Sequence, residues 1–411
     1  MTDRSFDEEM MRRALAEAVK SGGFVNPNPL VGAVVVKDGR IIGIGRHERY
    51  GQLHAERNAL ASCTEDPRGG TIYVTLEPCC HYGKTPPCTE AIIERGLARV
   101  VYGSPDPNPL VAGKSGQILR AAGIQVEGGL LAEECDRINP RFFHYITTKT
   151  PFVTMKYAMT LDGKTACWNG ESKWVTGPEA RRHVHETRGL CMGIMTGIGT
   201  VLADDPQLTC RDAAGLDPVR IVCDSRLRTP LEARLLRDIT CPGGTKGPGR
   251  ILDPEILSTT DTFTSDDHSR YPRTILATCE RNPAAQAPYL KAGADLLLCP
   301  EDEDGHLDLP ILMKALGSLG MDSILLEGGS GLNWSALKAG LVHQVQAYAA
   351  PKLFGGRTAN TPVGGAGVDH PADAVPLTDI TVRTIGPDLL IEGRIPHPGE
   401  DAEIRRRQAE A

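Results

Sequence analysis

A histidine, a glutamate and two cysteines stand in the order and spacing that a catalytic zinc site needs. His54 opens a predicted helix with Glu56 two residues later, and Cys79 and Cys88 come on either side of a loop that follows a predicted strand. Catalytic zinc takes three protein ligands and keeps a fourth position for water. One imidazole and two thiolates satisfy that count. The sequence therefore predicts one zinc ion per chain, held by His54, Cys79 and Cys88.

The glutamate fits the role of a proton shuttle. Water on zinc becomes hydroxide near neutral pH and can attack an amidine-like ring carbon. The departing ammonia needs a proton, and Glu56 lies close enough to His54 to reach the same water. A His-x-Glu pattern followed by Pro-Cys is the signature of zinc deaminases. We therefore expect Glu56 to be catalytic in the deamination of an amino-substituted nitrogen ring.

A structural zinc site is the alternative reading of the two cysteines. It needs a fourth ligand, which Cys80 or His81 could supply. The ordered combination of His54-Ala55-Glu56 with Pro78-Cys79, each at a strand–helix junction, favours catalysis.

The loop between the cysteines is unusually long. Eight residues separate Cys79 from Cys88, where common base deaminases have about two. The loop carries His81 and Lys84 beside the metal, which favours a substrate with an anionic group such as phosphate. The alternative for this loop is a solvated turn.

Composition restricts the class of protein. The 411 residues carry a formal net charge of −7, which disfavours a sequence-independent nucleic-acid binder. The acidic first twenty residues fit neither a secretory signal nor a transit peptide. No apolar run approaches the roughly 18 residues of a membrane-spanning helix. We expect a cytoplasmic enzyme that binds neither nucleic acid nor membrane. The sequence leaves open whether it forms a homo-oligomer.

The first half of the chain alternates helices and strands, which predicts an α/β sandwich. The expected elements are a helix at 6–20, a hairpin at 30–36 and 41–45, helices at 54–62 and 89–96, and strands at 71–76 and 99–102.

A polar segment ending at Pro151 marks the expected domain boundary. We predict a deaminase domain over residues 1–147, a second α/β domain over 151–396 and a charged tail over 397–411. The polar stretch 241–273 is expected to be a long surface loop.

Several motifs together resemble one known family, the bifunctional riboflavin-biosynthesis deaminase/reductases. They are Leu76-Glu77-Pro78-Cys79, the loop from His81 to Cys88, Asn26-Pro27-Asn28-Pro29-Leu30-Val31-Gly32 and Asp106-Pro107-Asn108-Pro109. The resemblance covers roughly residues 5–395. It implies a cytidine-deaminase-like α/β/α sandwich that removes the pyrimidine amino group from diaminohydroxyphosphoribosylaminopyrimidine. It also implies substrate contacts for Asn26, His47, His81, Lys84 and Asn108, with His81 and Lys84 at the phosphate end.

In the second domain, a strand at 323–326 ends in Glu327, and a glycine-rich turn leads to a helix expected at 334–340. Such a turn exposes backbone N–H groups to a phosphate, but by itself it favours a plain turn. The resemblance extends to this domain through Met159-Thr160-Leu161-Asp162-Gly163-Lys164, Gly170-Glu171-Ser172, Thr200-Val201-Leu202-Ala203-Asp204-Asp205-Pro206 and Glu327-Gly328-Gly329.

That resemblance implies a dihydrofolate-reductase-like α/β domain that uses NADPH to reduce a ribosyl side chain to ribityl. The implied NADPH contacts are Ala158, Trp174, Thr200, Asp204, Ser225, Gly329, Ser330, Gly331, Leu332, Asn333, Trp334 and Ser335. The implied substrate contacts are Ser172, Arg188, Leu208, Arg211 and Glu327. Lys156 and Asp204 are further candidates near the reacting sugar. The two arginines suit a phosphate, because guanidinium binds it bidentately, although Arg188 could instead form a surface salt bridge.

Two other functions remain open on sequence grounds. One is a zinc deaminase of a free nucleoside or of a tRNA base, against which the long loop between the cysteines and the reductase motifs argue. The other is a non-catalytic regulatory protein on the same folds, against which the intact set of His54, Glu56, Cys79 and Cys88 argues.

Overall fold

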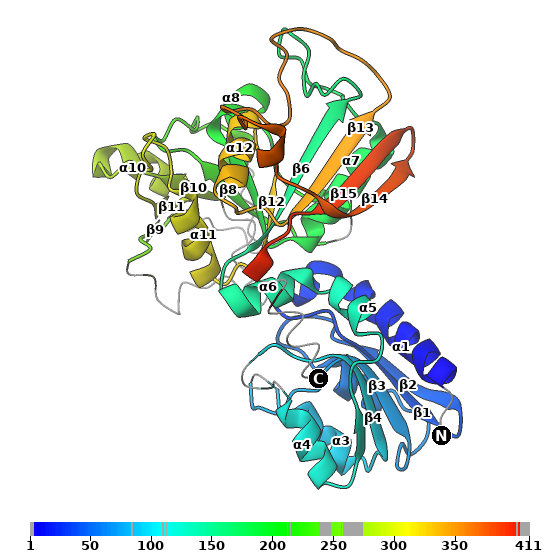
Figure 1. Cartoon of the computed structure of the whole chain (residues 1–411). Helices are drawn as coiled ribbons and strands as arrows, with labels where there is room; N and C mark the ends of the chain where they lie inside the picture. Colours follow the sequence, from blue (N-terminus) through cyan, green and yellow to red (C-terminus); the bar gives the residue numbers. More distant parts are fainter. Residues whose placement is uncertain are drawn as a thin grey trace. The chain divides into compact units, whose positions relative to one another are not determined.

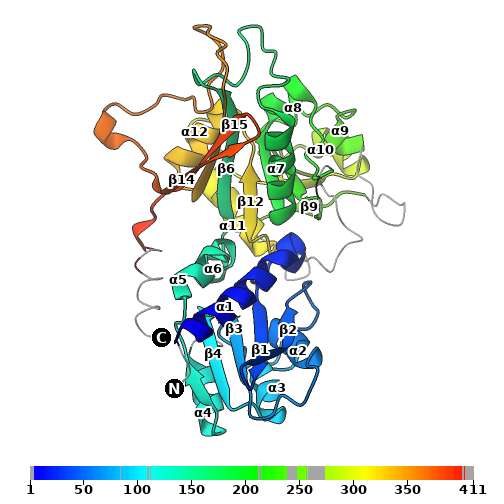
Figure 2. The same cartoon turned by 90° about the vertical axis from the view of Figure 1, so that its right-hand side faces the viewer.

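A computed structural model describes residues 4–83, 85–108, 111, 113–211, 213, 215–237, 248–255, 257, 274–399 and 402. The chain forms two compact units, one of Met1–Thr148 and one of Lys149–Phe263 with Asp267–His397. In Figures 1 and 2 the first unit runs from blue to cyan and the second from green to red. Among the described residues, no helix combines the length and the hydrophobicity that crossing a bilayer requires.

Up to residue 104 the first unit follows the helix and strand order expected from its sequence, and the helices and the strand after that point were not predicted. Its elements are α1 (Arg4–Ala18), η1 (Val19–Val25), β1 (Gly32–Lys37), β2 (Arg40–Arg46), α2 (Ala55–Ala61), β3 (Thr71–Leu76), α3 (Cys88–Glu94), β4 (Arg99–Ser104), α4 (Lys114–Ala121), β5 (Gln125–Glu127), α5 (Ala132–Arg137) and α6 (Pro140–Thr148).

The sheet of this unit has the order β2-β1-β3-β4-β5. Alternate residues of β1 face opposite sides: Val34 and Val36 pack with α1, whereas Ala33 and Val35 pack with α2 and α3. Figure 1 shows α1 on one side of the sheet and α3 and α4 on the other. The predicted α/β/α sandwich is confirmed. Because β3 and β4 are parallel, the segments that follow them leave from the same edge of the sheet.

The second unit is built on a larger sheet. Its elements are β6 (Phe152–Thr160), α7 (Pro178–Leu190), β7 (Gly193–Gly197), α8 (Ile198–Asp204), β8 (Val219–Cys223), α9 (Arg234–Arg237), β9 (Ile251–Leu252), β10 (Thr274–Thr278), α10 (Pro283–Lys291), β11 (Asp295–Leu298), α11 (Leu309–Ser318), β12 (Ser323–Leu326), α12 (Ser330–Lys338), β13 (Gln344–Ala350), η4 (Pro371–Asp373), β14 (Thr378–Ile385) and β15 (Asp388–Arg394).

The order of this sheet is β14-β15-β13-β6-β12-β7-β8-β10-β11-β9. The strands from β13 to β9 run parallel to one another, and β15 is antiparallel to both β13 and β14. Helices α11 and α12 pack against one face, and α8, α9 and α10 pack against the other. The carboxyl ends of the parallel strands therefore share one edge, where open α/β sheets bind their ligands.

Two elements of the second unit differ from the sequence prediction, and part of the predicted loop and tail lies outside the described residues. The helix expected at 334–340 begins at Ser330, because Gly329 in extended conformation is its N-cap and the following residues are already helical. The stretch 241–273, expected to be a loop, contains the short strand β9, which pairs with β11. Of that stretch only residues 248–255 and 257 are described, and most of the tail after 399 lies outside the described residues.

Candidate active sites

The three predicted zinc ligands come together in the first unit. The Nδ1 atom of His54 lies 3.4 Å from the Sγ atoms of both Cys79 and Cys88. The three ligand atoms lie within 4.8 Å of one another, and within the described part of the chain no other group of histidine, cysteine or acidic residues does this. His54 is the N-cap of α2 and Cys88 is the first residue of α3. The starts of two helices and the segment that follows β3 therefore lie close together in this unit.

A hydrogen bond between the two thiols shifts their pKa values in opposite directions. The hydrogen bond with Cys88 lowers the pKa of Cys79 to about 4, and His54 contributes in the same direction. Burial acts in the opposite direction but is outweighed. The hydrogen bond to Cys79 and burial raise the pKa of Cys88. The backbone N–H of Cys88 also donates to the Cys79 sulfur at 3.3 Å. A divalent cation bound by these cysteines would displace the thiol protons, since the ligand form of cysteine is the thiolate.

Glu56 lies in the first turn of α2 and is 3% exposed. Burial raises the pKa of its carboxyl to about 6, and the negative charge of Cys79 adds to the rise. A carboxyl with a pKa close to neutral can both accept and return a proton, which is what a shuttle needs. The donor set of one histidine and two cysteines with a non-ligating carboxyl beside it fits a catalytic zinc ion.

His47 lies against the ligand His54 with its ring centroid 5.4 Å away. Its Nδ1 contacts the Leu53 carbonyl oxygen at 3.1 Å and its Nε2 contacts Asn28 Nδ2 at 3.1 Å. Burial lowers the pKa of His47 to about 4, so the ring is neutral at physiological pH. Since Leu53 O only accepts, Nδ1 donates and Nε2 accepts from the amide. The geometry thus gives His47 the task of orienting Asn28.

Asn28 belongs to the sequence motif that runs from Asn26 to Gly32, but it was not predicted to be a site residue. Of the other predicted contacts, Asn26, His81 and Asn108 are half-buried, and their contacts with substrate stay predictions. The Nδ1 of His81 is buried and has no hydrogen-bond partner among the described residues. Lys84 lies outside the described residues.

Two further residues secure the long loop to the helix that begins at His54. Arg57 donates from Nε to the Pro86 carbonyl at 3.2 Å and from Nη2 to the Pro87 carbonyl at 2.8 Å, directly before Cys88. Thr85 Oγ1 lies 3.4 Å from His54 Nε2. Sequence reasoning missed both residues. The length of the loop between Cys79 and Cys88 could have indicated them, because a long loop needs contacts that hold it in place and a two-residue loop does not.

We expect replacement of Arg57 by lysine to speed zinc release roughly tenfold, a typical effect of losing a group that supports metal ligands. Lysine keeps the positive charge but not the planar fork that reaches two carbonyls. The measurement is transfer of zinc to a coloured chelator. The matched variant Arg13→Lys, on the exposed face of α1, should release zinc at the parental rate. Equal rates for both variants would show that the Arg57 contacts do not hold the site.

The second unit contains a cavity of about 1540 Å³ at the carboxyl edge of its sheet. The cavity is lined by every predicted NADPH contact and by five of the predicted substrate contacts near the sugar and phosphate, namely Lys156, Ser172, Arg188, Arg211 and Glu327. Leu208 is the exception. Its side chain is 4% exposed and it is not among the lining residues, because it is packed into the protein instead.

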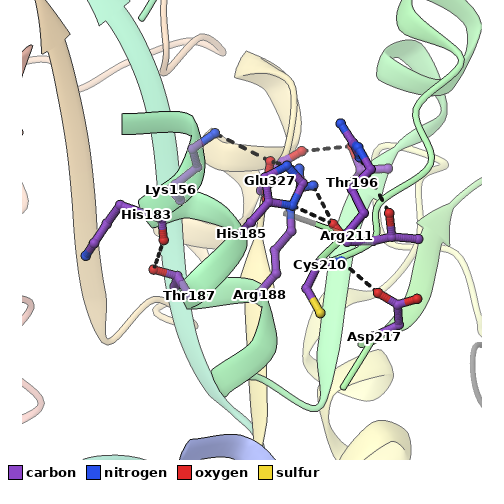
Figure 3. Close-up of polar contacts among 11 residues, drawn as sticks. Lys156, His183, His185, Thr187, Arg188, Thr196, Cys210, Arg211, Asp217 and Glu327 are labelled. Carbon is purple, nitrogen blue, oxygen red and sulfur yellow. Dashed lines mark hydrogen bonds and ion pairs between the residues drawn. The ribbon is translucent and has the colours of Figure 1, made fainter. Parts of the chain in front are cut away.

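Glu327 is the centre of a charged cluster in this cavity (Figure 3). Arg188 donates to it from Nε at 2.7 Å and from Nη2 at 2.9 Å, and Lys156 Nζ lies 3.4 Å from the same carboxylate. Burial alone would raise the pKa of Glu327, but the two cations outweigh it and lower the pKa to about 2. Glu327 is therefore ionised at neutral pH, and its carboxylate holds Lys156 of β6 at the wall of the cavity.

The partners of the two arginines separate their roles. Arg188 donates to Glu327 and to the Thr209 carbonyl, so its fork already has protein acceptors, and its salt bridge is buried rather than on the surface. Arg211 is exposed, and its Nη1 contacts Thr209 Oγ1 at 3.5 Å. Of the two, Arg211 is the better candidate for a phosphate ligand.

The turn that leads into α12 fits a dinucleotide phosphate. A side chain at Gly328 would meet Asn333 Oδ1 at 2.8 Å and would have to displace that amide, so glycine keeps the backbone accessible there. Asn333 Oδ1 is buried and accepts no hydrogen bond within the described part of the chain. Because α12 begins at Ser330, the N–H groups of its first turn are available at the cavity. The residues present thus fit the predicted nucleotide cofactor.

Fold and sites together define a zinc-binding deaminase domain joined to a reductase domain. Residues 4–104 match the family described as the cytidine and deoxycytidylate deaminase zinc-binding region, and residues 151–391 match the RibD C-terminal domain. The riboflavin biosynthesis protein RibD of Actinobacillus pleuropneumoniae is 48% identical over 386 residues, which cover 94% of each chain.

Solved structures agree with this assignment. Acinetobacter baumannii RibD superposes with a TM-score of 0.79 at 33% identity, covering 96% of this chain and 100% of that one. A diaminohydroxyphosphoribosylaminopyrimidine deaminase/5-amino-6-(5-phosphoribosylamino)uracil reductase from Thermotoga maritima gives a TM-score of 0.77 at 35% identity, with coverage of 96% and 99%. This chain belongs to the RibD family of riboflavin biosynthesis proteins, and it carries both the deaminase and the reductase domain.

Proposed function

We propose that the first domain removes the amino group from 2,5-diamino-6-ribosylamino-4(3H)-pyrimidinone 5′-phosphate, and that the second reduces the ribosyl side chain of the product to ribityl with NADPH. The observation that carries the proposal is the convergence of His54, Cys79 and Cys88 on one point, with buried Glu56 beside them, in a chain that also has the reductase cavity. The family assignment supports the same pair of reactions.

In the deaminase domain, bound zinc supplies a water that is acidic enough to react at neutral pH. Glu56 would accept a proton from that water and return it to the departing amino nitrogen, a role to which its raised pKa is suited. His47 stays neutral and holds Asn28 toward the ring of the substrate. Asn26, His81, Lys84 and Asn108 are the proposed further contacts, with His81 and Lys84 at the phosphate.

In the reductase domain, NADPH supplies the hydride that reaches the first carbon of the sugar. Lys156 of β6, held by Glu327, lines the cavity and would face the reacting sugar. Ser172 donates to Asp204 at 3.4 Å on the same wall. Arg211 binds the substrate phosphate. The residues that would hold the cofactor are Ala158, Trp174, Thr200, Asp204, Ser225 and the segment from Gly329 to Ser335, all of which line the cavity.

The partner of both sites is thus a small phosphorylated aminopyrimidine. A cytoplasmic location and the absence of nucleic-acid binding stay predictions from the sequence.

A crossed experiment tests the two-site function. A chelator should stop ammonia release, while NADPH oxidation on supplied deaminated substrate continues, because the zinc ligands all lie in the first domain. Arg211→Ala should raise the KM for reduction about tenfold by removing a charged hydrogen bond to phosphate, and leave deamination unchanged. If chelation also stops reduction, or if Arg211→Ala slows both steps equally, the division of function is wrong.

A further inference from the structure

The reductase cavity extends well beyond the charged cluster around Glu327. It continues past the start of α12 to the loop that follows β8, where Ser225, Arg226 and Arg228 line it, and on to the segment 302–307 after β11. In the sheet, β12 and β7 lie between β6 and β8. Three strand spacings correspond to roughly 14 Å. The cavity is therefore long enough for an extended dinucleotide laid across the strand ends.

The position of the reacting groups fixes the direction of such a dinucleotide. The nicotinamide must approach the sugar near Lys156 and Glu327, beside β6 and β12. The diphosphate suits the glycine turn and the first turn of α12 in the middle of the cavity. The adenosine half then lies at the end formed by the loop after β8. This step rests on the proposed function.

The loop after β8 is a fixed platform. Asp224 is fully buried and accepts from the backbone N–H of Arg228 at 2.9 Å, the N–H of Thr229 at 2.7 Å and the Thr229 hydroxyl at 2.7 Å. Tyr289 donates its hydroxyl hydrogen to the carbonyl of Leu227 at 2.6 Å. A loop held at both ends of its turn presents its exposed side chains from a defined backbone.

The two arginines on this platform differ in their partners. Arg226 Nη1 forms an ion pair with Glu301 at 2.7 Å. The guanidinium of Arg228 is exposed, lines the cavity and has no acceptor in the part of the chain that the structure describes. A guanidinium without a protein acceptor suits a phosphate monoester, which it can bind bidentately.

Two acidic residues at this end of the cavity oppose an anionic ligand, so the positive charges of the arginines have to outweigh them. Asp302 and Asp304 line it beside the arginines. Carboxylates repel a phosphate but accept hydrogen bonds from a ribose hydroxyl, which is how proteins commonly recognise NADH. We propose that Arg228 binds the 2′-phosphate of NADPH and so sets the preference of this reductase for NADPH over NADH.

The test is a titration of the full-length chain with nucleotide in the absence of substrate. The fluorescence of the reduced nicotinamide reports binding. Arg228→Ala should raise the Kd for NADPH about tenfold, an effect expected for a charged hydrogen bond at an exposed site, and leave the Kd for NADH unchanged. Adenosine 2′,5′-bisphosphate should compete with NADPH on the parental chain and lose most of that ability on the variant. The Kd of Arg228→Lys for NADPH should lie between those of the parental chain and of Arg228→Ala.

Two controls keep the outcomes distinct. Arg182→Ala removes an equal charge from an exposed ion pair on α7 that does not line the cavity, and it should change neither Kd. Ammonia release by Arg228→Ala reports that the rest of the chain is intact. Unchanged NADPH binding, or equal weakening of NADPH and NADH, would overturn the role of Arg228. If the parental chain bound neither nucleotide, the reductase proposal itself would fail.

Discussion

Replacing Glu56 by glutamine is expected to lower the rate of ammonia release roughly 10²–10⁴-fold, the usual contribution of a positioned acid–base group. Glutamine has nearly the same shape and fits the same buried position, but it cannot take a proton from water and pass it on. Glu56 is not one of the three ligand residues, so the variant should keep its zinc. Ammonia release under substrate saturation and metal content by atomic absorption are the measurements.

The matched control for this variant is Glu9→Gln, which removes the same charge from an exposed position of α1. It should deaminate at the parental rate. NADPH oxidation on deaminated substrate should be unchanged in both variants, because the reductase cavity lies in the other unit. Ammonia release by Glu56→Gln at the parental rate would disprove the shuttle.

The second large effect is expected from the cysteines. Cys88→Ser and Cys79→Ser should each lose zinc and slow deamination by more than roughly 100-fold, since loss of a group that merely supports a ligand already costs about 10–100-fold. Serine is close in size to cysteine, so the packing around buried Cys88 should persist. The zinc content of purified protein decides the point.

The neighbouring thiol gives an internal control. Cys80 is adjacent to Cys79 but is not part of the three-ligand group, and burial raises the pKa of its thiol, which opposes the thiolate form that binds metal. Cys80→Ser should therefore retain stoichiometric zinc. Zinc loss in Cys80→Ser would indicate a four-ligand structural site, and full zinc in Cys79→Ser or Cys88→Ser would refute the ligand set.

The sequence by itself determined the zinc centre and the class of fold. Each ligand stands at the start of a helix or the end of a strand, so local patterns predict both the element and the residue at its end. The α/β/α sandwich followed from the same alternation of elements. The resemblance to the deaminase/reductase family supplied most of the reductase residues, because the spacing within that domain carries little chemistry of its own.

Only the tertiary structure decided how distant residues pair. Glu327 receives Arg188 and Lys156 from 139 and 171 residues away, because β12 lies between β6 and β7 in the sheet. Arg57 reaches Pro87 across the loop. Hydrophobic periodicity specifies which face of an element is buried but not which element lies beside it. Which elements become neighbours is determined when the whole sheet assembles. That assembly places Arg188 next to the carboxylate of Glu327 and Arg228 at the cavity.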